Sequence, residues 1–492
     1  MMKKALRQAV LIVALGIAGL PFASEASAFG PGSTVRSFEA DSFIKNDGTF
    51  WSWGFGLPVP TRIPALTDVE RTFPEGFFMK RDKSVWRWER KSYRSVEAVV
   101  NPVGGLRDLV AVYPEWRETL ALGTDGTVYR IPKNEGKLLT DQSEVVGGIK
   151  NVKAIGRFAE ERSYNWVFLK TDGTLWKGDH SLSAFEPVQP SDRFTQIDYA
   201  YALNADGTLW KFAEPYDPTL IEAQLGALTP IDGLEDIREF NWKRVAIDGQ
   251  SRLWFFGATI TGFSDGTMYH YAEKPYVLTG IQGVKDAFIV ERSLIAWTET
   301  GEVYETSIDR DRLPSDAEFH LLAGDVSEIR HGNRYFLMRK NDGAIWGWGV
   351  NKDYRLGSGD REFMHRTPVR VQLPIAVELN GQSVELVPGV VVRDSQAYVP
   401  LRAVFGKMGA AIDWNNSTKI AKIDRAAFKG KAAISIVVDY RQGTIDINGK
   451  RANAAPLSIG ESSYLPLRSI SESLGAQVQW IREDDRIKID LK

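Results

Sequence analysis

Short runs of alternating apolar and polar residues recur along the first three quarters of the chain. Each run is followed by a two-residue turn. After the turn come Thr or a similar residue, an apolar residue and an aromatic residue. Alternation with a period of two predicts a β-strand, and Asp-Gly, the turn in five of eight copies, favours a tight hairpin. The aromatic residues that end the eight copies are Trp51, Trp86, Tyr129, Trp176, Trp210, Trp254, Tyr304 and Trp346.

Successive copies lie 34 to 50 residues apart, which is the length of one small antiparallel sheet with its connections. This spacing favours a mainly β fold, a β-propeller of seven or eight blades, over a β-solenoid, whose coils are shorter. We expect the repeated Trp side chains to pack in or between blades. Three copies replace Asp-Gly, and the further Asp, Asn and Glu ligands of a calcium loop are missing. The turns are therefore predicted to be structural.

The last copy continues as "IWGWGVNKDYRLGSGDREFMHRTPVRV" over residues 345–371. It resembles the Trp-Gly, Leu-Gly-x-Gly and Thr-Pro-Val signature of regulator-of-chromosome-condensation repeats, and this resemblance covers about residues 33–372. Members of that family commonly have seven blades, whereas eight copies are counted here, so the number stays open. We expect a strand near Val369–Val371 to pair with Val35–Phe38 and close the ring.

The chain beyond residue 374 contains a different repeat. Residues 398–424 match residues 464–490 at a constant offset of 66, and each copy predicts strand, helix, strand and strand. An Asn-Gly hairpin precedes each copy, which predicts a smaller α+β domain of two tandem units, 375–424 and 434–491. The shared Tyr-x-Pro-Leu-Arg and Trp elements resemble the copper amine oxidase N-terminal or stalk domain, over about residues 375–491. That domain recurs in exported proteins of Gram-positive bacteria.

The first 28 residues predict a signal peptide, with three basic residues, an apolar run and a small-residue cleavage site at Ala28. We therefore expect a secreted or cell-wall-associated protein with no membrane span in the mature chain. The formal net charge of −2 gives no support to nucleic-acid binding. There is no cysteine, so neither disulfides nor thiolate metal sites can form.

Candidate catalytic chemistry is sparse. The five histidines lack the spacing of a metal site, and none follows His365, so the copper site of the oxidases cannot form in the C-terminal units. No Gly-x-Ser-x-Gly elbow or phosphate-binding loop is present. We predict no cofactor, no metal and no enzymatic activity. The alternative of a propeller hydrolase or lyase requires titratable residues in the central channel.

Binding residues are expected where the copies differ, because loops on a rigid scaffold carry function more often than the scaffold does. Tyrosine and arginine are favoured at interfaces, which selects Tyr93, Arg94, Tyr216, Tyr269, Tyr271, Tyr354 and Arg355. Arg402 and Arg468 either pair within their own repeats or bind an anionic wall polymer. The sequence thus predicts a binding protein whose propeller face holds an extracellular protein or a cell-wall glycan, with the stalk-like domain as a spacer or envelope module. A secreted inhibitor of the β-lactamase-inhibitor propeller type is the alternative.

Overall fold

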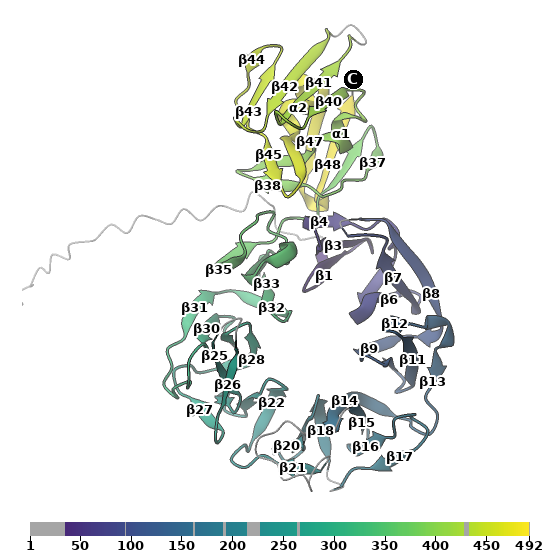
Figure 1. Ribbon diagram of the computed structural model, residues 1–492, viewed down its shortest axis with the longest axis vertical. Coiled ribbons are helices and arrows are strands. Elements are labelled where there is room, and N and C mark those ends of the chain that lie inside the picture. Colours follow the sequence, from purple (N-terminus) through teal and green to yellow (C-terminus); the bar gives the residue numbers. More distant parts are fainter. Residues whose placement is uncertain are drawn as a thin grey trace, which may run out of the picture.

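The computed structural model describes residues 35–93, 95–160, 163–189, 193–213, 227–262, 266–427 and 432–491. The predicted signal peptide lies outside the described residues. Eight small antiparallel sheets stand in a ring between residues 35 and 371, and an α+β domain lies outside the ring beside β4 (Figure 1). The described residues thus contain eight blades, one for each copy counted in the sequence.

The first four blades follow one another along the chain. Their strands are β1 (Val35–Glu39), β2 (Ser42–Lys45), β3 (Phe50–Gly54) and β4 (Leu57–Arg62); β5 (Val69–Thr72), β6 (Phe77–Lys80), β7 (Ser84–Arg90) and β8 (Ala98–Arg107); β9 (Leu109–Pro114), β10 (Glu118–Gly123), β11 (Val128–Asn134), β12 (Lys137–Leu138) and β13 (Glu144–Val145); and β14 (Val152–Glu160), β15 (Ser163–Lys170), β16 (Leu175–Gly178) and β17 (Phe185–Pro187).

The other four blades complete the ring. Their strands are β18 (Phe194–Asp198), β19 (Tyr201–Asn204), β20 (Leu209–Phe212) and β21 (Leu228–Pro230); β22 (Ile237–Asn241), β23 (Val245–Asp248), β24 (Leu253–Phe255) and β27 (Tyr276–Leu278); β28 (Val284–Val290), β29 (Ser293–Thr298), β30 (Val303–Ser307) and β31 (His320–Ala323); and β32 (Val326–His331), β33 (Tyr335–Lys340), β34 (Ile345–Val350) and β35 (Met364–Arg370). The sixth blade also carries an inserted hairpin of β25 (Ala258–Thr261) and β26 (Met268–Tyr271).

Each blade has its first strand nearest the centre of the ring and its fourth at the rim (Figure 1). Because the strands are antiparallel, the connections from first to second and from third to fourth strand emerge on one side of the ring, which we call the loop face. The connections from second to third strand, which contain the Asp-Gly turns, emerge on the other side, which we call the turn face. The 3-10 helix η4 (Lys352–Tyr354) belongs to the loop face.

The core of the ring lies between neighbouring blades. Trp86 packs against Ile44 and Phe50 of the preceding blade, and Trp176 packs against Leu120 and Leu122 of the blade before its own. The other aromatic residues that end the repeat copies occupy the same kind of position. The prediction that these side chains pack between blades is confirmed.

The expected closing strand is wrong. In the described structure β1 pairs with β2 and β35 pairs with β34, so Val369–Val371 do not pair with Val35–Phe38. All strands of each described blade come from one continuous stretch of chain, so no strand is exchanged between blades. The first and last blades instead meet through side chains, with Val35 and Phe38 packed against Leu337.

The C-terminal domain builds one hydrophobic core from both tandem repeats. Its strands are β36 (Ala376–Leu379), β37 (Gln382–Val384), β38 (Val391–Arg393), β39 (Gln396–Pro400), β40 (Ala411–Asn415), β41 (Ile420–Arg425), β42 (Ile434–Asp439), β43 (Thr444–Ile447), β44 (Lys450–Arg451), β45 (Leu457–Ile459), β46 (Ser462–Pro466), β47 (Ala476–Ile481) and β48 (Arg486–Leu491), and its helices are α1 (Leu401–Phe405) and α2 (Leu467–Ser473). β36 of the first repeat pairs with β48 of the second, and β39 pairs with β46, so the repeats are interlocked.

Candidate functional site

The Asp-Gly-Thr turns of the turn face contain a short chain of hydrogen bonds. The backbone N–H and hydroxyl of Thr174 both donate to Asp172 Oδ1 (3.0 and 2.6 Å), and Trp176 Nε1 donates to Thr174 Oγ1 (3.0 Å). The hydroxyl of Thr174, followed by its backbone N–H, holds the pKa of Asp172 below its ordinary value. The same arrangement recurs at Trp51, Trp86 and Trp210. The motif therefore closes the hairpin and orients the indole, which is a structural role.

Exposed aromatic side chains gather on the opposite side of the ring. Among the described residues every aromatic side chain that is largely exposed belongs to the loop face, in or beside a connection or in the inserted hairpin: Phe55, Tyr93, Trp116, Tyr164, Trp242, Tyr269, Tyr271 and Phe363. Tyr93, Tyr269 and Tyr271 were predicted from the sequence, and the other five were not. Their position within the blade could have identified them, because each of these five residues lies in or beside a connection between the first and second or the third and fourth strands.

The structure brings two of the predicted residues together where the last blade meets the first two. The hydroxyl of Tyr93 donates to Asp353 Oδ1 of η4 (3.3 Å), and the Arg355 guanidinium lies 4.1 Å from the centre of the Phe55 ring. Arg355 also reaches Asp41 Oδ2 at 3.5 Å. Burial raises the pKa of Asp41 while the nearby arginine charges oppose that shift.

The remaining predicted residues lie elsewhere. Tyr269 and Tyr271 project from β26 on the sixth blade, where the Arg244 guanidinium lies 5.0 Å from the Tyr271 ring. Tyr354 is half-buried against the C-terminal domain, so its side chain serves that contact. Arg94 and Tyr216 lie outside the described residues.

A row of aromatic and arginine side chains in contact crosses blades four to six of the loop face. Tyr199 and Trp242 stack with ring centres 5.4 Å apart and planes at 25°, and the Arg157 guanidinium lies 4.4 Å from Tyr199 and 5.3 Å from Tyr164. Trp116 lies beside this row on the third blade, next to Glu115, which pairs with Arg157. We call these five residues the aromatic arc.

The arc is held in place by polar contacts beneath it. Arg157 forms an ion pair with Glu115 and donates to the carbonyl oxygen of Pro114 (3.1 Å). The backbone N–H of Trp242 donates to Asp198 Oδ2 (2.9 Å), and burial raises the pKa of that carboxyl. These contacts hold Arg157 and the backbone of Trp242 in place, while Trp242 stays 48% and Trp116 61% exposed.

The central channel shows a feature that the sequence analysis missed. The first strand of every described blade carries a β-bulge after its first residue. In three blades the bulged residue is a cation that donates to a backbone carbonyl of the next blade: Arg36 to Val69 (2.7 Å), Lys153 to Thr195 (2.9 Å) and Arg238 to Val284 (2.8 Å). Bulges increase local twist and redirect side chains, and here they link neighbouring inner strands.

Carboxyl groups also occupy the inner strands of three adjacent blades. Burial raises the pKa values of Asp198, Glu239 and Asp286, and the negative charges of the other two raise that of Glu239 further. The channel wall is therefore titratable, as the hydrolase or lyase alternative requires. Across the described ranges, no three His, Asp or Glu side chains are grouped so that they could hold a metal ion. No helix in the same ranges is both long and apolar enough to cross a bilayer.

Residues 378–489 match the sequence profile described as the copper amine oxidase N-terminal domain. The resemblance predicted for this part of the chain is confirmed, and the C-terminal domain has that fold. The match covers the two tandem repeats and none of the propeller. The catalytic domain of the copper oxidases is not part of what matches.

Comparison with solved structures finds matches of low similarity. Prp20p from Saccharomyces cerevisiae has a TM-score of 0.41 and 12% identity, covering 62% of this chain and 90% of its own. Human WBSCR16 has a TM-score of 0.36 and 15% identity, covering 64% and 85%. The computationally designed Ika8 protein has a TM-score of 0.38 and 14% identity, covering 65% and 98%. No curated protein matches the chain.

Proposed function

We propose that this protein is an exported, non-catalytic binding protein whose propeller holds an extracellular protein on the loop face. The C-terminal domain would act as a spacer or envelope module. The observation that supports this function is the placement of all largely exposed aromatic side chains of the described residues on one face. Tryptophan, tyrosine and arginine dominate the binding energy of protein interfaces, and scattered surface residues would not collect on one side of a ring.

The geometry of the arc favours tight binding. Arg157 and Trp242 both contact Tyr199, so these three side chains have little freedom left to lose when a partner covers them. The C-terminal domain lies outside the ring (Figure 1), and the view onto the ring shows the loops of blades three to six uncovered by it.

The test uses immobilised mature protein to capture a partner from secreted and cell-surface fractions. A double variant, Trp116→Ser with Trp242→Ser, is expected to lose a partner that the wild type retains. The matched control is Leu321→Ser, which removes a side chain 57% exposed on the outer strand β31. Retention of every captured protein by the double variant would overturn the loop-face assignment. Sequencing the N-terminus of exported protein tests cleavage after Ala28.

An enzyme inhibitor is a special case of the same function, in which the captured protein is itself an enzyme. The fixed arc resembles the kind of rigid surface that inhibitors present to their targets. Inhibition of a secreted hydrolase by wild type and not by the double variant would establish it.

The hydrolase or lyase alternative is favoured only by the channel carboxyls. Carboxyl groups with raised pKa values can act as general acids. The test is turnover of a polysaccharide or peptide substrate. Turnover that disappears in Glu239→Gln but persists in the double variant Trp116→Ser with Trp242→Ser would favour an enzyme over a binding protein.

A further inference from the structure

The two repeats of the C-terminal domain are related by a local twofold axis. β39 and β46 pair antiparallel, with Tyr398 opposite Pro466, Pro400 opposite Tyr464, and Val399 opposite Leu465 between them. Residues 66 positions apart therefore exchange places across the axis. A surface feature whose side chains occur in both repeats is consequently built twice.

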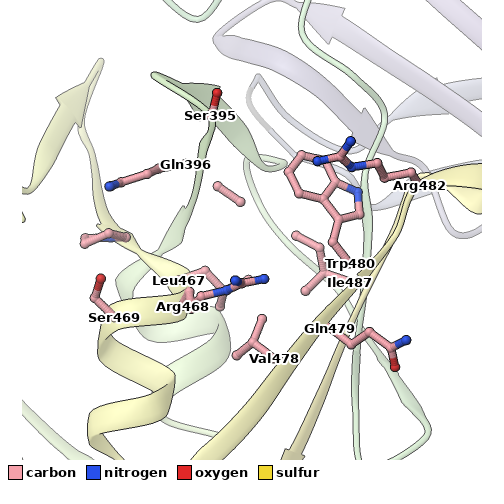
Figure 2. A pocket seen from close by; sticks show the side chains of 12 residues that line it. Ser395, Gln396, Leu467, Arg468, Ser469, Val478, Gln479, Trp480, Arg482 and Ile487 are labelled. Carbon is pink, nitrogen blue, oxygen red and sulfur yellow. The ribbon is translucent and has the colours of Figure 1, made fainter. Parts of the chain in front are cut away.

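One such feature is a cavity of about 540 Å³. It lies between the start of α2, the strands β47 and β48, and the β38–β39 hairpin of the other repeat. Figure 2 shows Arg468 extending from α2 into the space between that helix and the strand of Trp480, with Arg482 beside the indole. Ser395 and Gln396 of the hairpin line the opposite side.

The second cavity, of about 940 Å³, occupies the equivalent place in the first repeat. Arg402 and Trp414 stand where Arg468 and Trp480 stand in the first cavity, and the β45–β46 hairpin replaces β38–β39. Tyr440 adds a second ring, edge-on to Trp414 with ring centres 5.5 Å apart. Both cavities thus combine an indole wall, an arginine at the start of a helix, and a polar hairpin from the other repeat.

Both cavities are cationic in a chain whose formal net charge is −2. No carboxylate lines the first, and the second has Arg402, Lys419 and Arg441 against one carboxylate. Within the described part of the chain, the Arg402 and Arg482 guanidinium groups make no hydrogen bond or ion pair. Arg468 only approaches Glu472, at 4.0 Å. The expected pairing of each arginine within its own repeat is absent for Arg402 among these residues.

We propose that the cavities are two copies of one binding site for an acidic polysaccharide, a chain of sugars that bear carboxylate or phosphate groups. The indole gives an apolar, polarisable wall for the C–H face of a sugar ring. Guanidinium groups bind carboxylate or phosphate with paired hydrogen bonds. The serine and glutamine side chains of the hairpins offer donors and acceptors to hydroxyl groups.

The duplication selects a polymer over a single sugar. Both volumes fall in the range of small-ligand sites, about 300–1,000 Å³. Two equivalent sites on one rigid domain gain avidity from a ligand that repeats the same charged unit. This site is separate from the loop face, and its failure would leave the proposed protein-binding function standing.

The experiment measures binding of the full mature chain to polygalacturonate, phosphorylated dextran, unmodified dextran and a single-stranded oligonucleotide at low and high salt. Binding to one or both acidic polysaccharides, weakened by salt, with none to dextran, is expected. Polygalacturonate and phosphorylated dextran distinguish a carboxylate from a phosphate source. Arg402→Gln and Arg468→Gln should each weaken binding by about tenfold, which corresponds to one lost charged contact of about 1.4 kcal/mol.

The matched control is Lys407→Gln, which removes one charge from an exposed position outside both cavities. It should change the affinity less than twofold. Thermal melts test whether each variant folds. Arg402→Lys keeps the charge but loses the paired donors, so it should bind more tightly than Arg402→Gln and less tightly than the wild type. The proposal would be overturned by any of three results: binding of the oligonucleotide alone, binding to neither acidic polysaccharide, or equal effects of Lys407→Gln and Arg402→Gln.

Discussion

The hydroxyl oxygen of Thr61, on the outer strand of the first blade, accepts a 2.9 Å hydrogen bond from the backbone N–H of Gly389 in the C-terminal domain. Both residues are buried. Arg393 of the same domain donates to the carbonyl oxygen of Gly359 in the last blade (3.1 Å). The domain therefore contacts both blades at the junction where the first and last blades meet without a chain connection between them. We infer that its docking helps to hold the ring shut.

Gly389→Ala should weaken this docking. A Cβ atom at this position would clash with the carbonyl oxygen of Pro60, and backbone cannot yield as a flexible side chain can. We expect a loss of about 2 kcal/mol, in the usual range for an overpacked site, and separate unfolding transitions for the two domains in calorimetry. Gly147→Ala is the matched control, because nothing lies within 4 Å of a Cβ there. A single transition at the wild-type temperature would contradict the docking role.

Thr174→Val should destabilise the fourth blade. The change keeps the shape of the side chain but removes the hydroxyl that joins Asp172 to Trp176. One lost hydrogen bond of this kind costs about 1 kcal/mol, which denaturant unfolding can measure. Thr174→Ser is the control, because Ser84 makes the same two contacts in the second blade. Equal loss in both variants would mean that the hydroxyl contributes no more to stability than the methyl group does, which would contradict the prediction.

The same turns predict a loss of stability in acid. Hydroxyl groups lower the pKa values of Asp82, Asp172 and Asp206 below the ordinary 3.8. Their stabilising contribution is therefore complete above about pH 4 and is lost as the pH falls through the lowered values. Denaturant unfolding between pH 2.5 and 6 should show a free energy that falls below about pH 4. Thr174→Val should reduce that slope, and an unchanged slope would contradict the assignment.

The repeat pattern predicted the architecture because turn chemistry and core packing are local. Asp172, Thr174 and Trp176 lie within five residues, and their contacts recur wherever the residues recur. Contacts between residues far apart in the sequence could not be predicted from the repeat pattern. The ring junction was predicted wrongly because pairing of Val35–Phe38 depends on which strand the last blade leaves free. The loop face was only partly predicted, because Trp116 and Trp242 come to lie on the same surface only when the blades are arranged in a ring.

The C-terminal cavities illustrate the same limit. The offset of 66 residues marked Arg402 and Arg468 as equivalent, but their pairing within each repeat was an expectation from adjacency. The structure shows instead that each arginine faces the hairpin of the other repeat. Interlocking of the repeats is a long-range property, and one sequence does not reveal it.

Lys45 should be the most sensitive position between the two domains. Its ammonium group is buried, and it donates to the carbonyl oxygens of Pro374 (3.3 Å) and Asp484 (3.2 Å) and lies 3.9 Å from Asp485 Oδ2. Burial lowers the pKa of Lys45, and the Asp485 charge opposes this shift. Lys45→Met keeps the length of the side chain but leaves these buried oxygens without the cation. We expect a loss of about 3 kcal/mol in the free energy of unfolding, because removing one partner of a buried pair leaves the charge of the other uncompensated.

The double variant Lys45→Met with Asp485→Asn should recover part of that loss, since the amide of Asn carries no charge that needs a partner. Lys83, whose ion pair with Glu70 is partly exposed, provides the control: Lys83→Met should cost much less stability than Lys45→Met, because water screens an exposed pair. Equal losses for Lys45→Met and Lys83→Met would mean that the contact between the domains contributes no more than a surface ion pair.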